Sequence, residues 1–540
     1  MSIPRRSETG LKTVSAVLSM ACAAFLFTGS CAPSASTPAD TAAVAAAGGV
    51  LTVDDGSIVD GNGRPVMLRG VNMDLFYHLI GDDTSRPFTY AGREDVRLLS
   101  EMGANALRLC LNWKLFADTS GYALVDDYLE WCREEGMYLI LDMHVVPPND
   151  RAAGTGVWDE GGGMLADLWG EIAAVYAGEP MIAGYDIYNE PRPPHRVQWW
   201  VLSREIISSI REQDPDHIIF VDMVGYWEEG FRPYDDPGVV YTIHFYRPFP
   251  VTHWGATWGD DAPVPPGTVY PGEVLTAVKT VSSSEETALE TPAGDWTRLD
   301  TGVLRPDEDA EWAGFRLGAS GNTGMVQFDD LELEVNGASF QVWNPDFEEP
   351  SPARGPWPST WYYSAEGDFR AEWGEVGRTS GRTSGRSAVL EGSTGSASWY
   401  QATKRTGPLV SLDGVDSLRL SCWVRAPENR GSVTLRADYL RGEYEYFDRD
   451  AILDAISPAA DFAHRQGSPL YVGELGVING APQDSRVRLA RDMLSVMNQL
   501  GLHWTWWTYR GAGDLSFGFK RDDGSMDTGM VMVLEEALRE

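Results

Sequence analysis

Two glutamates end apolar segments that are typical of buried strands. Glu190 closes the segment Ile187-Tyr188-Asn189-Glu190, and Glu474 closes Tyr471-Val472-Gly473-Glu474 much further along the chain. Two carboxyl groups brought to one place can serve as acid and nucleophile, or as acid and base, in cleavage of a glycosidic bond. If the carboxyls lie only about 5 to 5.5 Å apart, one can attack the anomeric carbon directly, and the anomeric configuration is retained. The pair therefore predicts glycosidic chemistry, provided that the fold brings the two segments together.

The surrounding sequence predicts a fold that does this. From residue 66, short apolar runs alternate with longer amphipathic segments, which is typical of βα units around a parallel sheet. The eight expected strands are Val66–Asn72, Ala106–Trp113, Tyr138–Val145, Ile182–Glu190, His217–Asp222, Val239–Tyr246, Pro469–Gly476 and His503–Tyr509. The expected helices are Arg93–Met102, Val125–Glu135, Leu165–Tyr176, Val197–Glu212, Arg449–Gln466, Ser485–Leu500 and Met530–Leu538, with a weak one after the fifth strand. In such a barrel the catalytic side chains come from the carboxyl ends of the strands, so Glu190 and Glu474 should meet at one mouth.

The alternation stops between Tyr270 and Tyr446, where Gly, Ser, Thr and short alternating strands dominate. This composition indicates an inserted all-β domain between the sixth strand and its helix. The predicted fold class is therefore α/β: a (β/α)₈ TIM barrel in two segments, residues 50–272 and 444–540, interrupted by a β-sandwich at residues 273–443.

Both barrel segments carry motifs that resemble glycoside hydrolase family 5, the family of many cellulases and mannanases. The motifs fall in order at the expected strand ends: Leu68-Arg69-Gly70-Val71-Asn72, Leu107-Arg108, Asp142-Met143-His144, Asn189-Glu190-Pro191, His244-Phe245-Tyr246, Gly473-Glu474 and Trp507-Thr508-Tyr509. A lone Asn-Glu-Pro would be weak, but seven ordered matches are specific. The family usually has a second His after the one in the third-strand motif, and here Val145 follows His144.

The resemblance implies a role for each matched residue. Glu190 would be the acid/base, kept protonated by a nearby second carboxylate. Glu474 would be the nucleophile, kept ionised by Arg108 and by a hydrogen bond from Tyr246. The implied substrate-binding residues are Arg108, His144, Asn189, His244, Tyr246 and Trp507. Among them, Asn189 would bind the sugar 2-hydroxyl and Trp507 would stack on the pyranose ring, while Trp254 and Trp258 are candidates for contacts beyond the cleaved bond. No metal and no organic cofactor are implied.

The inserted domain resembles the jelly-roll carbohydrate-binding modules of many polysaccharidases. The motifs that carry this resemblance are Asn344–Glu348, Gly385–Ala388, Trp399–Gln401, Ser421–Arg425 and Phe328–Leu331. The first of these usually opens such a module and the last closes it, so the reversed order here indicates a circular permutation. Asn336-Gly337, a strong tight-turn signal, would join the original ends. We therefore predict one sandwich in which strands before residue 335 pair with strands after residue 340, rather than two incomplete modules. The domain could bind carbohydrate or serve as a spacer.

The amino terminus has the pattern of an export signal: basic residues, an apolar run from Val14 to Phe27, and small residues before Cys31. Residues 1–31 are predicted to be a signal peptide, and residues 32–49 a flexible linker. Lipidation of Cys31 would attach the protein to a bacterial membrane as a cell-surface lipoprotein, and free secretion is the alternative. Besides Cys22 and Cys31 there remain Cys110, Cys132 and Cys422, which suggest neither a disulfide framework nor a zinc site.

Charge and composition limit the partners. Net charge is −36, which excludes a polyanionic partner such as nucleic acid, because phosphates are held by clustered Lys and Arg. The 20 Trp and 21 Tyr suit the flat apolar faces of sugar rings. The expected partner is a β-linked polysaccharide or oligosaccharide, and the expected state is a monomer.

The predicted activity is retaining hydrolysis of a β-glucan by double displacement, as in an endo-β-1,4-glucanase. The sequence leaves open a β-mannanase, an exo-β-glucosidase, a glycolipid-directed glycosidase, a transglycosylase, and a sugar-binding protein without catalysis, because loop geometry decides among them.

Overall fold

The structure is a computed structural model of the 540-residue chain. It describes residues 49–74, 90–149, 156–158, 161–223, 233–256, 268–350, 357–374, 385–401, 409–511, 516–521 and 523–540. The predicted signal peptide, most of the predicted linker, Cys31 and Trp258 lie outside these residues.

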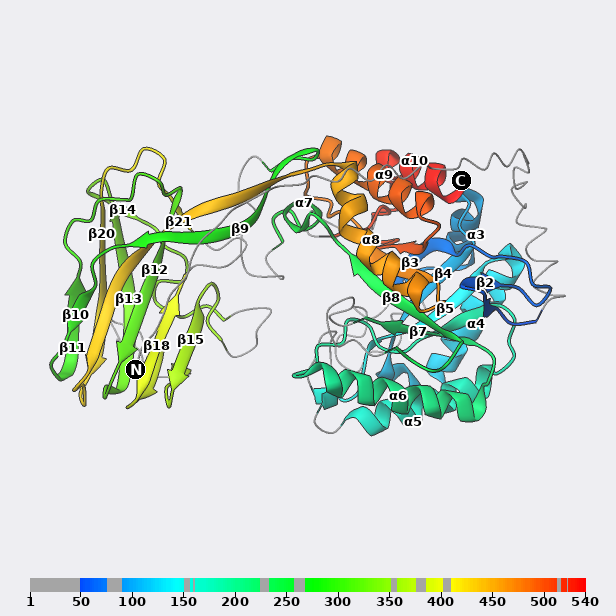
Figure 1. Ribbon diagram of the computed structural model, residues 1–540, viewed down its shortest axis with the longest axis horizontal. Coiled ribbons are helices and arrows are strands. Elements are labelled where there is room, and N and C mark those ends of the chain that lie inside the picture. Colours follow the sequence, from blue (N-terminus) through cyan, green and yellow to red (C-terminus); the bar gives the residue numbers. More distant parts are fainter. Residues whose placement is uncertain are drawn as a thin grey trace, which may run out of the picture. The chain divides into compact units, whose positions relative to one another are not determined.

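Eight parallel strands close into a barrel, as predicted (Figure 1). In spatial order they are β22 (Leu470–Leu475), β23 (His503–Trp506), β3 (Arg69–Asp74), β4 (Ala106–Asn112), β5 (Tyr138–Val145), β6 (Ile182–Asp186), β7 (Ile218–Asp222) and β8 (Val239–Phe245), with β8 pairing back to β22. Every residue of β4 and β5 is buried, as expected for parallel strands covered on both faces. Close packing also explains Gly70 of β3, where a Cβ atom would lie 1.8 Å from the carbonyl oxygen of Ala106.

Helices alternate with these strands along the chain. They are α3 (Arg93–Met102), α4 (Ser120–Glu135), α5 (Gly161–Tyr176), α6 (Arg196–Gln213), α8 (Arg449–Arg465), α9 (Gln483–Gln499) and α10 (Thr528–Leu538). Short helices η2 (Trp113–Phe116), η3 (Gly156–Trp158) and α7 (Phe249–Thr252) lie in the loops, and a small hairpin, β1 (Thr52–Asp54) and β2 (Ser57–Val59), precedes the barrel. The weak helix expected after the fifth strand falls largely on residues 224–232, which are outside the described set.

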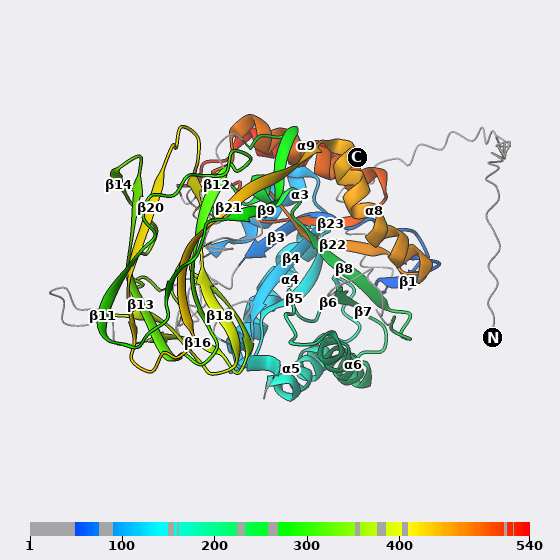
Figure 2. The same ribbon diagram turned by 60° about the vertical axis from the view of Figure 1, so that its left-hand side comes forward.

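The strands between α7 and α8 in chain order form two antiparallel sheets, which Figure 2 shows as two layers. The first sheet contains β10 (Thr287–Leu289), β21 (Ser432–Phe447), β12 (Trp312–Ser320), β18 (Gly395–Tyr400) and β15 (Tyr362–Gly367), with β9 (Gly272–Ser283) and β19 (Val410–Ser411) attached. The second contains β11 (Ala293–Asp300), β20 (Leu418–Ala426), β13 (Gly324–Val335), β17 (Ser387–Gly392) and β16 (Arg370–Gly374), with β14 (Ala338–Phe340) attached. Both sheets contribute to one apolar core, for example through Phe315 and Trp399 of the first and Phe328 of the second.

The predicted pairing across residues 335–340 is confirmed. β12 pairs with β18 and β21, and β13 pairs with β17 and β20, so early and late strands of the insert share both sheets. Asn336 and Gly337 form a two-residue hairpin turn between β13 and β14, with φ angles of 51° and 78°. The Asn336 side chain accepts hydrogen bonds from the backbone of Asp416 and Ser417, which ties this turn to the chain before β20.

β9 and β21 pair from Gly272–Phe447 to Ser283–Asp438, and they are the strands by which the chain leaves the barrel segment and returns to it. In the described part of the chain, Cys110, Cys132 and Cys422 are buried and free. None of the helices described here combines the length and apolar character needed to cross a membrane.

Candidate active site

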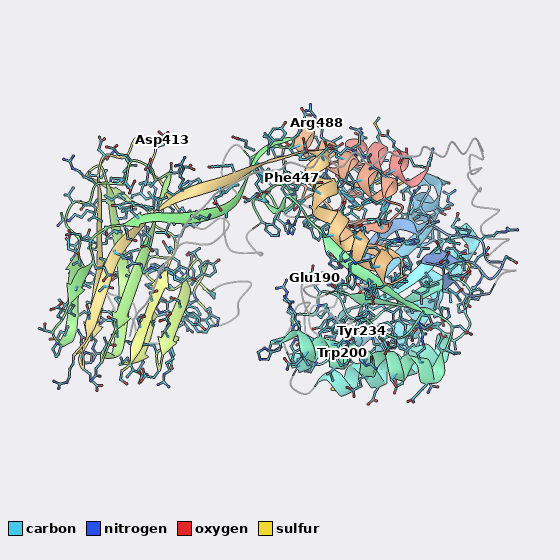
Figure 3. The ribbon with its side chains drawn as sticks, in the orientation of Figure 1. Glu190, Trp200, Tyr234, Asp413, Phe447 and Arg488 are labelled. Atoms are coloured by element: carbon cyan, nitrogen blue, oxygen red, sulfur yellow. The ribbon has the colours of Figure 1, made fainter. Side chains whose placement is uncertain are left out.

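Inward-facing side chains near the carboxyl ends of the strands gather at one mouth of the barrel. Side chains two residues apart on a strand share a face, so several strands contribute a stacked pair. The polar residues brought together in this way are Asn72 and Asp74 of β3, Arg108 and Cys110 of β4, Asp142 and His144 of β5, Asp186 of β6, Asp222 of β7, His244 of β8 with Tyr246 just beyond it, and Glu474 of β22, joined by Asn189 and Glu190 after β6. Figure 3 labels Glu190 at the edge of the barrel ribbon.

Arg108 is the centre of this cluster and is fully buried. Its Nε donates to Asp186 at 2.9 Å, and its Nη1 donates to Asn72 at 2.9 Å and to Glu474 at 3.0 Å. Its Nη2 donates to Asn189 at 2.9 Å. Arg108 therefore both contacts the predicted nucleophile and pairs with a barrel acid, because the guanidinium group has five N–H donors in a fixed plane.

Glu474 is held by three neighbours. One carboxylate oxygen accepts from Arg108, and the other accepts from the hydroxyl of Tyr246 at 2.8 Å. Nδ1 of His244 lies 3.4 Å from that second oxygen. Hydrogen bonds from cationic and phenolic donors stabilise a carboxylate in its charged form.

Glu190 faces Glu474 across His244. Nδ1 of His244 lies 2.9 Å from one oxygen of Glu190, and one ligand atom each of Glu190, His244 and Glu474 lie within 4.8 Å of one another. The backbone of Glu190 has a φ of 45°, in the left-handed region that residues other than Gly rarely adopt. Such strain is retained where the surrounding structure requires one orientation of the side chain.

The expected protonation of Glu190 is corrected by this geometry. Burial alone would raise the pKa of Glu190, but the hydrogen bond and positive charge of His244, with a contribution from Arg192, lower it to about 2. Burial lowers the pKa of His244, while Glu474 and then Glu190 raise it to about 9. The sequence analysis placed a proton on Glu190 because of the second carboxylate. The lowered pKa of Glu190 and the raised pKa of His244 instead favour a proton on His244, which stands between the two glutamates.

His144 and Trp507 form one wall of the mouth. Nδ1 of His144 lies 2.7 Å from Asp142. The rings of His144 and Trp507 stack with their centroids 5.3 Å apart. Trp254, a candidate for contacts beyond the cleaved bond, is partly buried and packs against the barrel core.

Sequence reasoning missed several acids of the mouth. Burial raises the pKa of Asp186 to about 6 and that of Asp222 to about 7. Asp74 is also buried. Their signal was present only in part, because each ends a strand of the structure, while only Asp222 ends a predicted one. Asn72 was noticed as part of a motif, and the structure shows its amide donating to the carbonyl of Gly473 across the closure of the barrel.

Two groups of side chains in the described residues have the types of ligand that metals bind: Glu190, His244 and Glu474, and Cys110, Asp142 and His144. Arg108 lies against an acid of each group, 3.0 Å from Glu474 and 3.1 Å from Asp142. These acids therefore already have a cationic partner. Hydrogen bonds and ion pairs explain why the side chains of each group lie together.

A closed parallel barrel with two carboxylates this close at the ends of its fourth and seventh strands has the arrangement of a retaining glycoside hydrolase. Residues 59–285 match the family model for cellulase, glycosyl hydrolase family 5. This part of the chain is therefore similar to glycosyl hydrolase family 5. The match ends just beyond β9, the strand that leaves the barrel segment, so Glu474 and Trp507 lie outside it.

Among curated proteins, the chain is 28% identical over 202 residues to Endoglucanase C of Acetivibrio thermocellus, covering 34% of this chain and 59% of that relative. It is 26% identical over 249 residues to a β-xylosidase of Phanerodontia chrysosporium, covering 37% of this chain and 52% of the relative. The chain thus spans little more than half the length of these relatives. A solved structure of a hyperthermophilic endo-β-1,4-glucanase in complex with substrate aligns with a TM-score of 0.46 and 13% identity, covering 87% of this chain and 97% of that one.

Proposed function

We propose that the protein is a retaining β-glycoside hydrolase that cleaves β-glucan by double displacement, as an endo-β-1,4-glucanase does. The observation that carries the proposal is the spacing of Glu190 and Glu474, whose nearest oxygens lie within 4.8 Å. This spacing suits direct attack by one carboxylate, whereas inverting enzymes keep their carboxyls about 6.5 to 9.5 Å apart to admit a water molecule. The similarity to Endoglucanase C supports β-glucan as the substrate class.

In the first step, Glu474 attacks the anomeric carbon, the bond to the leaving oxygen breaks, and Glu190 gives that oxygen a proton. In the second step, Glu190 removes a proton from water, the water oxygen attacks the anomeric carbon, and the bond to Glu474 breaks. Because the pKa shifts of Glu190 and His244 favour a proton on His244, a proton must reach Glu190 before the first step. Exclusion of water by the sugar favours this transfer, since it makes a separated charge pair costlier.

Hydrogen bonds to Glu474 match its proposed part. Arg108 and Tyr246 hold its two oxygens separately, which fixes the orientation of the carboxylate before attack. Asn189 is oriented by Arg108 and is placed to contact the sugar 2-hydroxyl, where hydrogen bonds strengthen in the transition state. The stacked rings of His144 and Trp507 provide an apolar wall for the pyranose.

The test compares Glu474→Ala with Glu190→Ala on a soluble β-1,4-glucan and on a dinitrophenyl β-cellobioside. Glu474→Ala should abolish turnover of both substrates. Glu190→Ala should lose roughly 10²- to 10⁴-fold on the glucan but much less on the aryl glycoside, whose leaving group needs no proton. Azide should then give a β-glycosyl azide with Glu190→Ala and an α-glycosyl azide with Glu474→Ala. Glu94→Ala, whose side chain is 77% exposed on α3, is the control and should behave as the unmodified protein.

Proton NMR of the earliest product should show the β-anomer. An initial α-anomer would rule out double displacement, and substantial activity of Glu474→Ala would refute its part as nucleophile. A panel of soluble β-1,4-glucan, β-1,3-glucan, mannan, xylan and glucosylceramide tests the substrate. Hydrolysis of another member in preference to β-1,4-glucan would replace that part of the proposal.

A further inference from the structure

The side chain of Asp74 points into the mouth of the barrel. Asp74 lies two residues beyond Asn72 on β3, so the two side chains share a face and Asp74 is one step nearer the open end. Asn72 contacts Arg108 on that face. In the barrel, β3 lies between β23, which precedes Trp507, and β4, which carries Arg108. Asp74 therefore borders the same part of the mouth as Trp507.

Asp74 is buried with one carboxyl oxygen that lacks a hydrogen-bond partner within the described part of the chain. Its residue is 5% exposed, and Oδ1 has no hydrogen-bond partner among the residues that the structure describes. All three nitrogens of Arg108 are directed at other groups: Nε and Nη1 donate to Asp186, Asn72 and Glu474, and Nη2 donates to Asn189 and lies 3.1 Å from Asp142. An unpaired buried carboxyl destabilises a fold, so its retention at this position calls for a partner.

The chemistry of that partner follows from the state of the carboxyl. Burial, then the negative charges of Glu474 and Asp142, raise the pKa of Asp74 well above its ordinary value. The protonated form of the Asp74 carboxyl, which this raised pKa favours, has one O–H donor and a carbonyl acceptor. A sugar hydroxyl likewise donates one hydrogen bond and accepts others. A cation would contact only the carbonyl oxygen, and an anion would accept only from the O–H group.

We propose that Asp74 is a further sugar-binding residue, whose carboxyl group holds a ring hydroxyl of the sugar that lies against Trp507. The proposal rests on the proposed function of the mouth as a glycoside site and adds a residue that selects the sugar on the non-reducing side of the cleaved bond. A site built to hydrogen-bond a hydroxyl discriminates strongly against a sugar that lacks it, because the buried carboxyl is then left unpaired.

The experiment measures kcat/KM for p-nitrophenyl β-glucoside and its 3-, 4- and 6-deoxy analogues, and for p-nitrophenyl β-cellobioside and its analogues lacking the 3- or 6-hydroxyl of the ring next to the cleaved bond. The unmodified protein should lose about 10- to 100-fold on one of the three glucoside analogues. Asp74→Ala should lose a similar factor on the parent glycoside and nothing more on that analogue. Asp74→Asn, which keeps the shape, a donor and an acceptor, should retain most of the discrimination. Asp54→Ala, an exposed acid, is the control and should leave all ratios unchanged.

These ratios separate contact with the sugar from support of the fold, since a loss of folded protein affects parent and analogue equally. If Asp74→Ala discriminates among the deoxy analogues as the unmodified protein does, Asp74 does not touch the sugar and the proposal is overturned. If the unmodified protein hydrolyses neither these glycosides nor soluble β-1,4-glucan, the proposed function fails instead. The affinities for methyl β-cellobioside and its deoxy analogues are then compared by calorimetry. This comparison tests whether Asp74 contacts the sugar without requiring turnover.

Discussion

Replacing Glu190 with glutamine should lower the pKa of His244 and so weaken the affinity of His244 for its proton more than tenfold. In the structure, His244 donates to Glu190 over 2.9 Å and lies 3.4 Å from Glu474. The substitution keeps the shape of the side chain and removes one of the two negative charges. It therefore tests whether His244, rather than Glu190, carries the proton between the two carboxylates.

The size of the effect follows from the pKa values of the pair. Burial lowers the pKa of His244, and Glu474 followed by Glu190 raises it to about 9 from the ordinary 6.5. This rise corresponds to about 3 kcal/mol, at about 1.4 kcal/mol for each tenfold change. Because the Glu190 side chain is 37% exposed, water screens its charge. We assign about 2 kcal/mol to it, so Glu190→Gln should lower the pKa of His244 to about 7.5.

The same pair should stabilise the fold only within a pH window. His244 has a raised pKa, so its contribution is complete below about 6.5 and is lost as the pH rises through about 9. Glu190 has a lowered pKa, so its contribution is complete above about 4.5 and is lost as the pH falls through about 2. The difference in Tm between the unmodified protein and Glu190→Gln should therefore be largest between about pH 4.5 and 6.5.

The assay is an NMR titration with isotope-labelled histidine. The chain has eight His, and the resonance of His244 is identified by its loss in His244→Asn. Glu94→Gln, an exposed acid of α3, is the control and should leave the pKa of His244 unchanged. A pKa for His244 near 6.5 in the unmodified protein, or one that does not move in Glu190→Gln, would refute the account of the proton.

Two further predictions concern the barrel centre and the sandwich. Arg108→Lys keeps the charge but offers three donors in place of five, so we expect a loss of about 2 to 4 kcal/mol in the free energy of unfolding by urea and at least about tenfold in kcat. Arg133→Lys, 49% exposed, should change neither, and an unaltered Arg108→Lys protein would contradict the network. Gly337→Ala, at a φ of 78°, should lower the stability of the sandwich by about 1 kcal/mol in thermal unfolding. Gly294→Ala, where a Cβ would meet nothing within 4 Å, should not, and equal Tm values for the two would contradict the turn.

Strand positions could be predicted from the sequence, because apolar runs mark where the barrel is buried, but strand ends could not. The run predicted to end at Glu190 leaves the sheet at Asp186, and the one predicted to end at Tyr509 leaves it at Trp506. In both cases the chain stays apolar while it turns across the mouth. Thr508 and Tyr509 donate instead to the carbonyl of Asn72. Hydropathy reports burial and not the backbone ladder, so it extends strands into the residues that form the site.

Protonation could not be predicted either. The motifs place Glu190, His244 and Glu474 at one mouth, yet the state of Glu190 depends on whether His244 stands beside the two glutamates or between them. That order is set by contacts between β6, β8 and β22, which are distant in the sequence. Asp74 escaped notice for the same reason, since its burial depends on neighbouring strands that the local pattern does not identify.

The partners of the two glutamates differ in a way that supports their proposed parts. Glu474 is paired with Arg108, whose guanidinium keeps its proton at any pH a folded protein meets, so the positive charge beside this carboxylate is permanent. Glu190 is paired with His244, whose imidazolium can lose its proton within the pH range of a folded protein, as a guanidinium cannot. A nucleophile needs the first arrangement, because a protonated carboxyl cannot attack. An acid/base needs the second, because it must gain a proton for one step and accept one in the next. Exchanging the two cations would leave the distances between the carboxyls intact and still impair both steps.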